Sequence, residues 1–343
     1  MTLVLVTGAT GYVGSNVVDQ LLLAGYRVRG TSRPSNAQRL REGYASFGDK
    51  FEVVEVEDLV TSGLAHALNG VDAVMHVASP GVPAAAAPAQ MLKVAVEATV
   101  RILEAASAAG VKKVVVTSSI VALASPADLW NKSTISHNDY NGMTYDDATK
   151  PGTSYFDIYG TSKALAEQAT WKFAEEHPEM YIATVHPPFL YGPTGKGQII
   201  RNLDSGTNRY IYALIAGPKG RFAPEQIYPP IFSHVADTAR AHVLALEAGP
   251  SESTKRRRVV AVSPSTFTWK QAVEYLHRQR PELIDRLPAA TGEESPVRSW
   301  ARYDVSSAAE IGLTQYVSWE QTVSDTVDDL LQKEKELGRP GMA

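Results

Sequence analysis

Short apolar runs alternate with longer segments of helical spacing through the first half of the chain. The short runs are rich in Val, Ile and Leu and lack apolar–polar alternation, which is typical of strands buried on both faces of a sheet. Strands that alternate with helices predict a parallel sheet with helices on both faces, joined by right-handed crossovers. The predicted strands are Leu3–Thr7, Arg27–Thr31, Glu52–Val56, Ala73–Val77, Val114–Ser118 and Ile182–His186, and the predicted helices include Val13–Ala24, Pro88–Ala109 and Ser162–Glu176.

The pattern changes after Pro193. Gly, Pro and aromatic residues punctuate residues 192–230, and helical segments with one late strand, Arg258–Val262, fill the remainder. The last helix is predicted over Trp319–Glu336 with Ser318 as its N-cap. This half is expected to form a smaller lobe whose insertions cover a pocket.

Composition excludes several kinds of site. The chain has 343 residues, a formal net charge of −4 and no cysteine, which excludes disulfides, thiolate nucleophiles and cysteine-ligated metals. Its eight histidines lack metal-ligand spacing, so no metal is expected. The slightly acidic balance gives no reason to expect nucleic acid, and no apolar stretch approaches the roughly 20 residues of a membrane span. Since the N-terminus lacks a secretory signal, we expect a cytoplasmic protein.

The first predicted strand runs into a glycine-rich turn and then into a helix. The turn reads Thr7-Gly8-Ala9-Thr10-Gly11-Tyr12-Val13-Gly14, and this order of elements is the context that a dinucleotide-binding fingerprint requires. Glycine lets the backbone approach a pyrophosphate, and the helix N-terminus supplies free N–H groups. The alternative is a tight turn with packing glycines, which the position of the motif disfavours. The expected cofactor contacts are Gly8, Thr10, Gly11, Tyr12, Val13 and Gly14.

The end of the second strand predicts which dinucleotide binds. An acidic residue there holds a free ribose 2′-hydroxyl, whereas arginine accommodates a 2′-phosphate. The segment from Arg27 to Arg33 contains no acid, and the planar guanidinium of Arg33 can donate two charge-assisted hydrogen bonds. The sequence therefore predicts NADP(H). Asp58 and Leu59 follow the third strand and are expected at the adenine edge.

Tyr159 and Lys163 lie four residues apart, so on a helix they project from the same face. A phenol that exchanges protons at neutral pH needs a pKa shift of about 3 units, or roughly 4 kcal/mol. A neighbouring ammonium, together with the positive ring of an oxidised nicotinamide, supplies charge of the required sign. The pair alone is a weak signal, because a surface helix pair looks the same, but its place downstream of a dinucleotide turn favours a catalytic role.

Hydroxyl residues end the strand that precedes this helix. The strand reads Val114-Val115-Val116-Thr117-Ser118-Ser119, and ligands bind at the carboxyl ends of parallel strands in open α/β sheets. A hydroxyl there can hydrogen-bond a carbonyl oxygen as negative charge develops during hydride addition. From the residues alone either Ser118 or Ser119 fits this role, or the hydroxyls merely cap the strand. His76 and His186 sit in apolar strands and are expected to be core histidines.

Together these patterns predict an α/β fold in two parts. Residues 1–190 are expected to form a Rossmann-type, doubly wound parallel sheet that includes the helix bearing Tyr159 and Lys163. Residues 191–343 are expected to form mainly a smaller C-terminal substrate-binding lobe, with some segments returning to the Rossmann domain. A chain of this length exceeds the usual size of one compact domain.

The chain resembles the extended short-chain dehydrogenase/reductase family over roughly residues 2–335. It looks most like dihydroflavonol reductases, cinnamoyl-CoA reductases and related fungal or yeast aldehyde and ketone reductases, of which Arg33 and Ala78-Ser79-Pro80 are typical. It departs from many members where Ala98-Thr99-Val100-Arg101 replaces Gly-Thr-x-Asn, and where Pro188 follows Pro187. The matching segments are the glycine-rich turn, Asp58-Leu59, His76–Pro80, Thr117–Ser119, Tyr159 with Lys163, His186-Pro187, Tyr191-Gly192-Pro193 and Phe232–His242.

The resemblance implies roles for individual residues. Ser119 is implied as the catalytic serine beside Tyr159 and Lys163, and Lys163 is also implied to hold the nicotinamide ribose. Further cofactor contacts are implied at Ala78, Ser79, Pro80, Thr117, Ser118, Pro187 and Leu190. The substrate pocket is expected to be lined by Ile120, Val121, Tyr155 and Phe189.

The expected function is NADPH-dependent reduction of a small-molecule aldehyde or ketone, with Tyr159 as proton donor. The apolar and aromatic lining expected for the pocket suits a hydrophobic or aryl carbonyl compound better than a sugar nucleotide. Two alternatives stay open. One is a hydroxysteroid dehydrogenase or a nucleotide-sugar epimerase or dehydratase, and the other is an NADP-sensing protein without turnover. The protein is expected to be a monomer or homodimer, with neither nucleic acid nor membrane as a partner.

Overall fold

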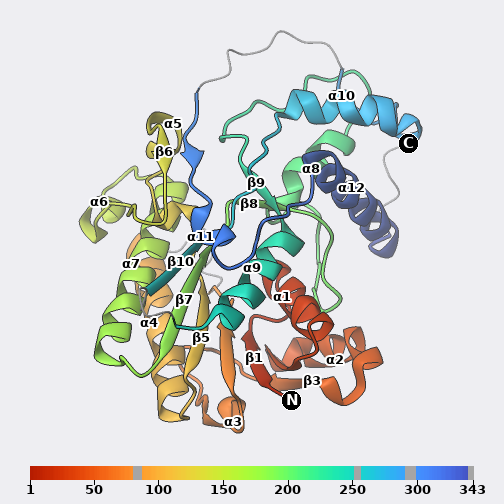
Figure 1. The fold of residues 1–343 in the computed structure, drawn as a ribbon. Coiled ribbons are helices and arrows are strands. Elements are labelled where there is room, and N and C mark those ends of the chain that lie inside the picture. Colours follow the sequence, from red (N-terminus) through yellow and green to blue (C-terminus); the bar gives the residue numbers. More distant parts are fainter. Residues whose placement is uncertain (80–86, 251–255, 290–298, 339–343) are drawn as a thin grey trace.

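The computed structural model describes residues 1–79, 87–250, 256–289 and 299–338. Its centre is a seven-stranded parallel sheet of order β10-β7-β5-β4-β1-β2-β3 (Figure 1). The predicted doubly wound α/β sheet is therefore confirmed, since every neighbouring pair in it is parallel. The strands are β1 (Leu3–Thr7), β2 (Arg27–Ser32), β3 (Phe51–Glu55), β4 (Ala73–His76), β5 (Lys113–Thr117), β7 (Tyr181–His186) and β10 (Arg256–Val260).

Every predicted strand except Leu3–Thr7 differs from the observed one by one or two residues, and two of these differences have a visible cause. β4 ends at His76, because the N–H groups of Val77 and Ala78 donate to the Thr7 hydroxyl, each at 3.1 Å, and leave the ladder. β10 begins two residues before the predicted Arg258, since backbone pairing with β7 carries three consecutive arginines into the sheet. The start of β10 is therefore set by backbone pairing with β7 and not by the hydrophobicity of its residues.

Helices cover both faces of the sheet (Figure 1). On one face α1 (Tyr12–Leu23), α2 (Pro34–Gly43) and α9 (Val235–Ala248) pack against β-strand residues such as Val4 and Val6. On the other face α3 (Ala65–Leu68), α4 (Pro88–Ala108) and α7 (Tyr155–Glu176) pack around Leu5 and Val114. The strand order reverses beside β1, so a crevice is expected at the carboxyl ends of β1 and β4, where ligands bind in this architecture.

α7 begins at Tyr155, seven residues before the predicted start. Its N-cap is Ser154, whose hydroxyl accepts from the N–H of Asp157 at 3.1 Å. A Ser N-cap of this kind satisfies one of the free N–H groups of the first turn. The earlier start matters because it places Tyr159 and Lys163 on one continuous helix.

The C-terminal lobe closes over the sheet from the side of β8 (Phe189–Tyr191) and β9 (Phe232–His234), which pair in parallel. Its apolar core gathers residues of α8 (Asn208–Ile215), α10 (Trp269–Gln279) and α12 (Trp319–Glu336). The predicted last helix is confirmed, with Ser318 accepting from the N–H of Gln321 at 3.2 Å. The remaining elements are β6 (Thr134–Ile135), paired with β11 (Arg302–Tyr303), the short helices α5 (Asp128–Asn131), α6 (Tyr145–Thr149) and α11 (Ser306–Ala309), and the 3-10 turns Ala45–Lys50, Ile120–Ala122 and Pro281–Leu283.

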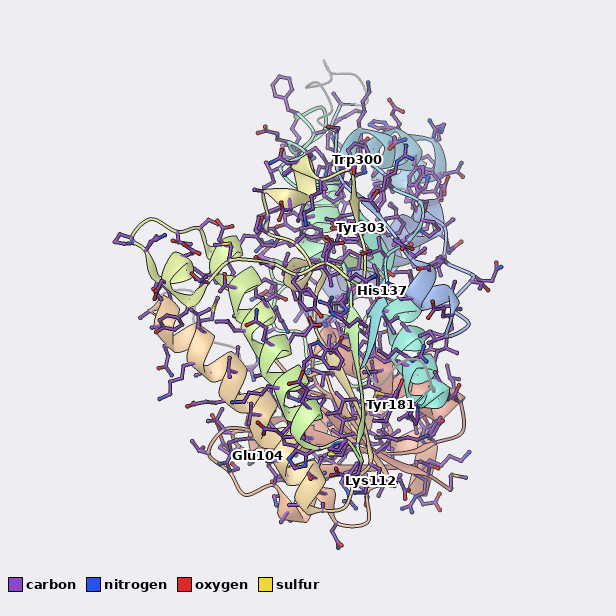
Figure 2. All side chains as sticks on the ribbon, turned by 60° about the vertical axis from the view of Figure 1, so that its left-hand side comes forward. Glu104, Lys112, His137, Tyr181, Trp300 and Tyr303 are labelled. Atoms are coloured by element: carbon purple, nitrogen blue, oxygen red, sulfur yellow. The ribbon has the colours of Figure 1, made fainter. Side chains whose placement is uncertain are left out.

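The two ends of the sheet have different surroundings (Figure 2). Lys112 and Tyr181 lie at the ends where β5 and β7 begin, whereas Trp300 and Tyr303 lie above the carboxyl ends. The lobe therefore covers only the end at which the candidate site residues gather. Among the helices that the structure describes, none is long and apolar enough to cross a membrane.

Candidate active site

The glycine-rich turn connects β1 to α1 and requires glycine for two reasons. Gly8 has φ +73°, and a Cβ there would lie 2.9 Å from the Ala78 Cα. At Gly14 a Cβ would lie 2.0 Å from the Gly8 carbonyl oxygen, so a side chain would force α1 away from the turn. Gly11 is the N-cap of α1. Because it has no side chain, it cannot cap the first N–H groups of that helix. The bare backbone at a helix N-terminus fits a pyrophosphate.

Thr7 and His76 join the ends of β1 and β4 below this turn. The Thr7 hydroxyl already accepts from two backbone N–H groups, so its own hydrogen points to His76 Nδ1, 2.9 Å away. His76 must therefore carry its hydrogen on Nε2 when it is neutral. Burial, aided by the positive charge of Lys163, lowers the pKa of His76 to about 3. His76 is thus a buried, neutral histidine of the sheet whose Nδ1 is hydrogen-bonded, and it also lines the pocket described below.

Tyr159 and Lys163 project from α7 toward the carboxyl end of β5. The Lys163 Nζ lies 5.9 Å from the centroid of the Tyr159 ring. Burial raises the pKa of Tyr159 to about 12, although a hydrogen bond with Ser119 acts in the opposite direction. Burial also lowers the pKa of Lys163 to about 8. Among the protein's own groups desolvation thus outweighs the hydrogen bond, and the expected lowering of this pKa would need the positive charge of an oxidised nicotinamide as well.

The two serines at the end of β5 face different partners. Ser119 lies within hydrogen-bonding reach of the Tyr159 phenol, and its hydroxyl accepts from the N–H of Val121 at 3.4 Å. Ser118 instead donates to Glu167 Oε2 at 2.8 Å. Successive residues of an extended backbone point in opposite directions. The geometry thus places only Ser119 beside the tyrosine.

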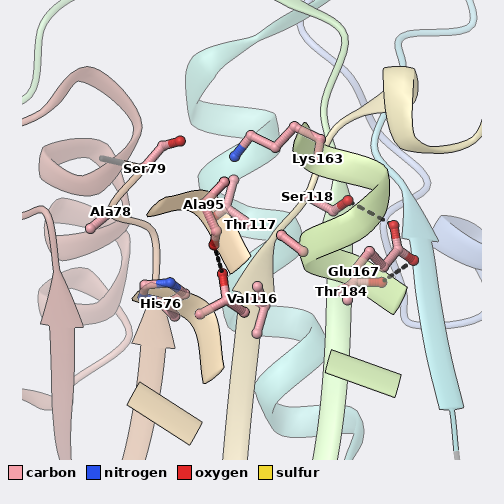
Figure 3. A pocket seen from close by; sticks show the side chains of 12 residues that line it. His76, Ala78, Ser79, Ala95, Val116, Thr117, Ser118, Lys163, Glu167 and Thr184 are labelled. Carbon is pink, nitrogen blue, oxygen red and sulfur yellow. Dashed lines mark hydrogen bonds between the residues drawn. The ribbon is translucent and has the colours of Figure 1, made fainter. Parts of the chain in front are cut away.

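Glu167 is a site residue that the sequence did not reveal. Its carboxylate is buried and accepts hydrogen bonds from five side chains (Figure 3 shows Ser118, Thr184 and Glu167). Besides Ser118, the donors are Trp171 Nε1 at 3.0 Å, the Thr184 hydroxyl at 3.5 Å, His186 Nε2 at 2.8 Å and Arg258 Nε at 2.6 Å. Burial alone would raise the pKa of Glu167, but His186 and Arg258 hold it well below its usual range. His186 is thus a satisfied core histidine, as predicted.

One signal for Glu167 was present in the chain. Tyr159, Lys163 and Glu167 are spaced by four residues, which sets all three on one face of α7. A pocket opens along this face, below the outstretched side chain of Lys163 (Figure 3). The residues that line it come from β4, β5, β7, α4 and α7 and are His76, Ala78, Ser79, Ala95, Thr99, Val116, Thr117, Ser118, Lys163, Ala166, Glu167 and Thr184.

Arg258 extends this buried network to the loop that contains Asp139 and Tyr140. Its guanidinium donates to the Asp139 carbonyl at 2.8 Å and lies 4.0 Å from the centroid of the Tyr140 ring. The next residue, Asn141, donates from Nδ2 to the carbonyl of Val121 at 2.8 Å. A buried charge pair thereby fixes the loop that supports the 3-10 turn after Ser119.

Three other expected cofactor residues at the strand ends, Thr117, Pro187 and Leu190, already form hydrogen bonds within the protein. The Thr117 hydroxyl lies 2.7 Å from Nε2 of His242 on α9. The Pro187 carbonyl accepts from the N–H of Ile120 at 3.1 Å, and the Leu190 carbonyl accepts from the Thr207 hydroxyl. Burial lowers the pKa of His242 to about 4, so the ring is neutral. The Thr117 and Ser118 hydroxyls therefore use their hydrogens within the protein, and toward a cofactor these oxygens can only accept.

The residues expected at the adenosine end occupy the other side of the glycine-rich turn. Arg33 is the exposed N-cap of α2. Asp58 Oδ1 accepts from the N–H groups of Val60 and Thr61 at 2.6 and 3.1 Å, so its carboxylate holds its own turn. Leu59 packs against the core under that turn. Pro80, also expected to contact the cofactor, lies outside the described residues.

The expected substrate residues lie around an aromatic cluster. Ile120 and Val121 are buried beside Tyr159, whereas the Tyr155 side chain is 55% exposed. Phe189 stands at the start of β8 and packs against the same core as Tyr159.

The sequence did not single out Phe156, Tyr210 and Tyr228, which complete this cluster. Ring centroids are separated by 5.1 Å for Phe189–Tyr228, 5.3 Å for Phe156–Tyr228 and 5.8 Å for Tyr210–Tyr228. We call Phe156, Phe189, Tyr210 and Tyr228 the aromatic wall. Phe156 also packs against the core shared with Tyr159, so the wall adjoins the candidate proton donor.

Comparison with known proteins places these features in a family. The sequence model of the NAD-dependent epimerase/dehydratase family matches residues 4–261. Ketoreductase adrE of Penicillium rubens is 34% identical over 85% of this chain and 84% of its own length. Ketoreductase sphI of Aspergillus fumigatus is 32% identical over 96% of this chain and 98% of its own. The structure of Gre2 from Candida albicans in complex with NADPH superposes with a TM-score of 0.84 at 27% identity, covering 97% of this chain and 99% of that one.

Proposed function

The chain belongs to the NAD-dependent epimerase/dehydratase family, and we propose that within it the protein catalyses the NADPH-dependent reduction of a hydrophobic or aryl ketone or aldehyde. The observation that carries this proposal is the convergence of Ser119, Tyr159 and Lys163 beside the aromatic wall. Its ketoreductase relatives support the reaction type. The structure of Gre2 in complex with NADPH supports the cofactor.

The residues present fit a bound dinucleotide. The glycine-rich turn offers bare backbone at the N-terminus of α1, where a side chain at Gly8 or Gly14 would collide with backbone. Arg33 would meet the 2′-phosphate, and Lys163 would hold the nicotinamide ribose. The residues that we propose for the cofactor are Gly8, Thr10, Gly11, Tyr12, Val13, Gly14, Arg33, Asp58, Leu59, Ala78, Ser79, Pro80, Thr117, Ser118, Tyr159, Lys163, Pro187 and Leu190.

When bound, NADPH supplies the hydride that reduces the carbonyl carbon. Tyr159 donates the proton to the carbonyl oxygen, since a phenol with a pKa of about 12 remains protonated at neutral pH. The Ser119 hydroxyl donates a hydrogen bond to the same oxygen as negative charge develops on it. Lys163, with a pKa of about 8, is predominantly an ammonium at pH 7 and stabilises the phenolate that remains.

The aromatic wall favours flat, apolar substrates. Phe156 and Phe189 pack against the core that includes Tyr159, and Tyr228 and Tyr210 extend the wall from them, so an aryl group would meet edge and face contacts. Ile120 and Val121 of the same core add aliphatic contact. A nucleotide sugar needs many polar partners, whereas the hydroxyls of Tyr210 and Tyr228 are the only polar side-chain groups among the four wall residues.

The deciding experiment compares Tyr159→Phe with wild type in carbonyl-dependent NADPH oxidation. The substrates are aromatic ketones, β-keto esters and aldehydes, and the assay is repeated with NADH. We expect a loss of about 10²- to 10⁴-fold in kcat for the variant, as for removal of a general acid, with NADPH binding retained. Tyr145→Phe, at an exposed tyrosine of α6, is the matched control and should keep full activity. Full activity of Tyr159→Phe would refute the assigned role.

The two alternatives give different results in the same preparation. An epimerase or dehydratase would retain NAD through gel filtration. A sensor without turnover would bind NADPH yet reduce no carbonyl in the panel. Either result would replace the reductase assignment.

A further inference from the structure

A segment of the C-terminal lobe crosses the glycine-rich turn. This strap, residues 192–201, follows β8 and runs over the start of α1. The Tyr12 hydroxyl donates to the Gly192 carbonyl at 2.9 Å, and the N–H of Ile199 donates to the Thr10 carbonyl at 3.1 Å. The strap is therefore hydrogen-bonded at both of its ends to the turn that we propose for the pyrophosphate.

Close packing fixes the strap in this place. A Cβ on Gly195 would lie 2.5 Å from the Ser15 hydroxyl oxygen, and a Cβ on Gly197 would lie 2.4 Å from the Tyr44 ring. The buried Tyr44 in turn donates to the Ser15 carbonyl at 2.9 Å. Because any larger residue would lift the strap off α1 and α2, its path across the cofactor side is built into the fold.

Arg201 ends the strap beside the first turn of α2. Its Nη2 donates to Asn36 Oδ1 at 3.3 Å, and Asn36 follows Arg33, the N-cap of α2, by three residues. Both arginines are exposed, and among the described residues neither forms an ion pair with a carboxylate. The first turn of α2 has no acidic residue. The strap thus brings a second uncompensated guanidinium to the edge where Arg33 stands.

We propose that Arg201 is a second residue that recognises the 2′-phosphate of NADPH, so that the C-terminal lobe contributes to cofactor choice. The inference rests on the proposed function. In this fold the adenosine ribose lies between the glycine-rich turn and the end of the second strand. The strap contacts both sides of that gap. Ile199 is hydrogen-bonded to Thr10 in the glycine-rich turn, and Arg201 is hydrogen-bonded to Asn36 at the start of α2. A phosphate has more acceptor positions than one guanidinium fork fills, which leaves room for a second.

The test measures the Kd values of NADPH and NADH by nicotinamide fluorescence in the full-length wild type and in Arg201→Gln. We expect the Kd of NADPH to rise about tenfold, as for one lost hydrogen bond to a charged group, and that of NADH to stay unchanged. Adenosine 2′,5′-bisphosphate should lose affinity by the same factor, because it carries the 2′-phosphate without the nicotinamide. Arg201→Lys keeps the charge and should recover part of the affinity for NADPH.

Arg278→Gln is the matched control, since Arg278 is an exposed arginine on α10 of the same lobe. It should leave both Kd values unchanged. An equal loss of NADPH and NADH affinity in Arg201→Gln, or no loss of either, would overturn the inference and leave the proposed function standing. A wild type that binds NADH as tightly as NADPH would instead refute the proposed cofactor preference together with the role of Arg201.

Discussion

Glu167→Gln tests how much the buried network behind the candidate site stabilises the fold. The substitution removes the negative charge of the carboxylate. Two side chains that donate hydrogen bonds to this carboxylate, Arg258 and His186, are only 6% and 0% exposed. The amide can still accept from Ser118 or Trp171, but its NH2 group has no acceptor where it faces the guanidinium Nε, now 2.6 Å from the carboxylate. The variant therefore isolates loss of charge and of acceptors with almost no change in volume.

Breaking one side of a buried ion pair costs about 3–5 kcal/mol, because the remaining charge stays desolvated. An unfolding entropy of about 2 cal/mol/K per residue, over 343 residues, converts this loss to a fall in Tm of about 4–7 °C. The free energy of unfolding is measured by urea denaturation followed by circular dichroism, and the Tm by calorimetry. Glu104→Gln, at an exposed glutamate of α4 (Figure 2), is the control and should change stability by less than about 0.5 kcal/mol.

The pH dependence gives a second, independent readout. Because the folded-state pKa of Glu167 is depressed, its contribution is fully present above the usual glutamate pKa of 4.5 and is lost as pH falls toward the folded value. The stability difference between wild type and Glu167→Gln should therefore be constant from about pH 5.5 to 8 and shrink below about pH 4. Equal stability of Glu167→Gln and Glu104→Gln at pH 7 would refute this reasoning.

Three further substitutions probe the site itself. Ser119→Ala should lower kcat by about 10²- to 10³-fold in the NADPH-oxidation assay. Ser118→Ala should instead mainly lower the free energy of unfolding, by about 1–2 kcal/mol. The reverse pattern would contradict the directions in which the two serine side chains point. With a pKa of about 8, Lys163 should lose its charge above that pH, so kcat/KM should fall on the alkaline side, and a flat profile to pH 10 would contradict its role as an ammonium. Gly8→Ala should abolish NADPH binding in a fluorescence titration, because φ +73° and contact with Ala78 leave no room for a Cβ, and retained binding would argue against the turn.

Much of the fold followed from local patterns along the chain. The predicted strands match the seven-stranded sheet closely, because apolar runs buried on both faces have few other solutions. α7 was predicted too short, since its start depends on the Ser154 cap and not on a continuous helical pattern. β10 was displaced by two residues, since its first residues are arginines that the ladder with β7 holds in the sheet.

For the candidate site, sequence reasoning succeeded where chemistry is set by neighbours in the chain. The glycine-rich turn could be predicted because its backbone conformation excludes other residues, and Tyr159 with Lys163 because helical spacing fixes their common face. The extent to which burial raises the pKa of Tyr159 could not be predicted, since this burial comes from α7 packing against the rest of the site. Local spacing says nothing about desolvation.

The sequence by itself determined the α/β architecture, the glycine-rich turn and the shared face of Tyr159 and Lys163. Only the tertiary structure decided between Ser118 and Ser119, because the choice depends on which serine meets Glu167. It also brought Arg201 to the start of α2. These contacts join residues far apart in the chain, and their distances are set by how the strands and lobes pack, which no local pattern encodes.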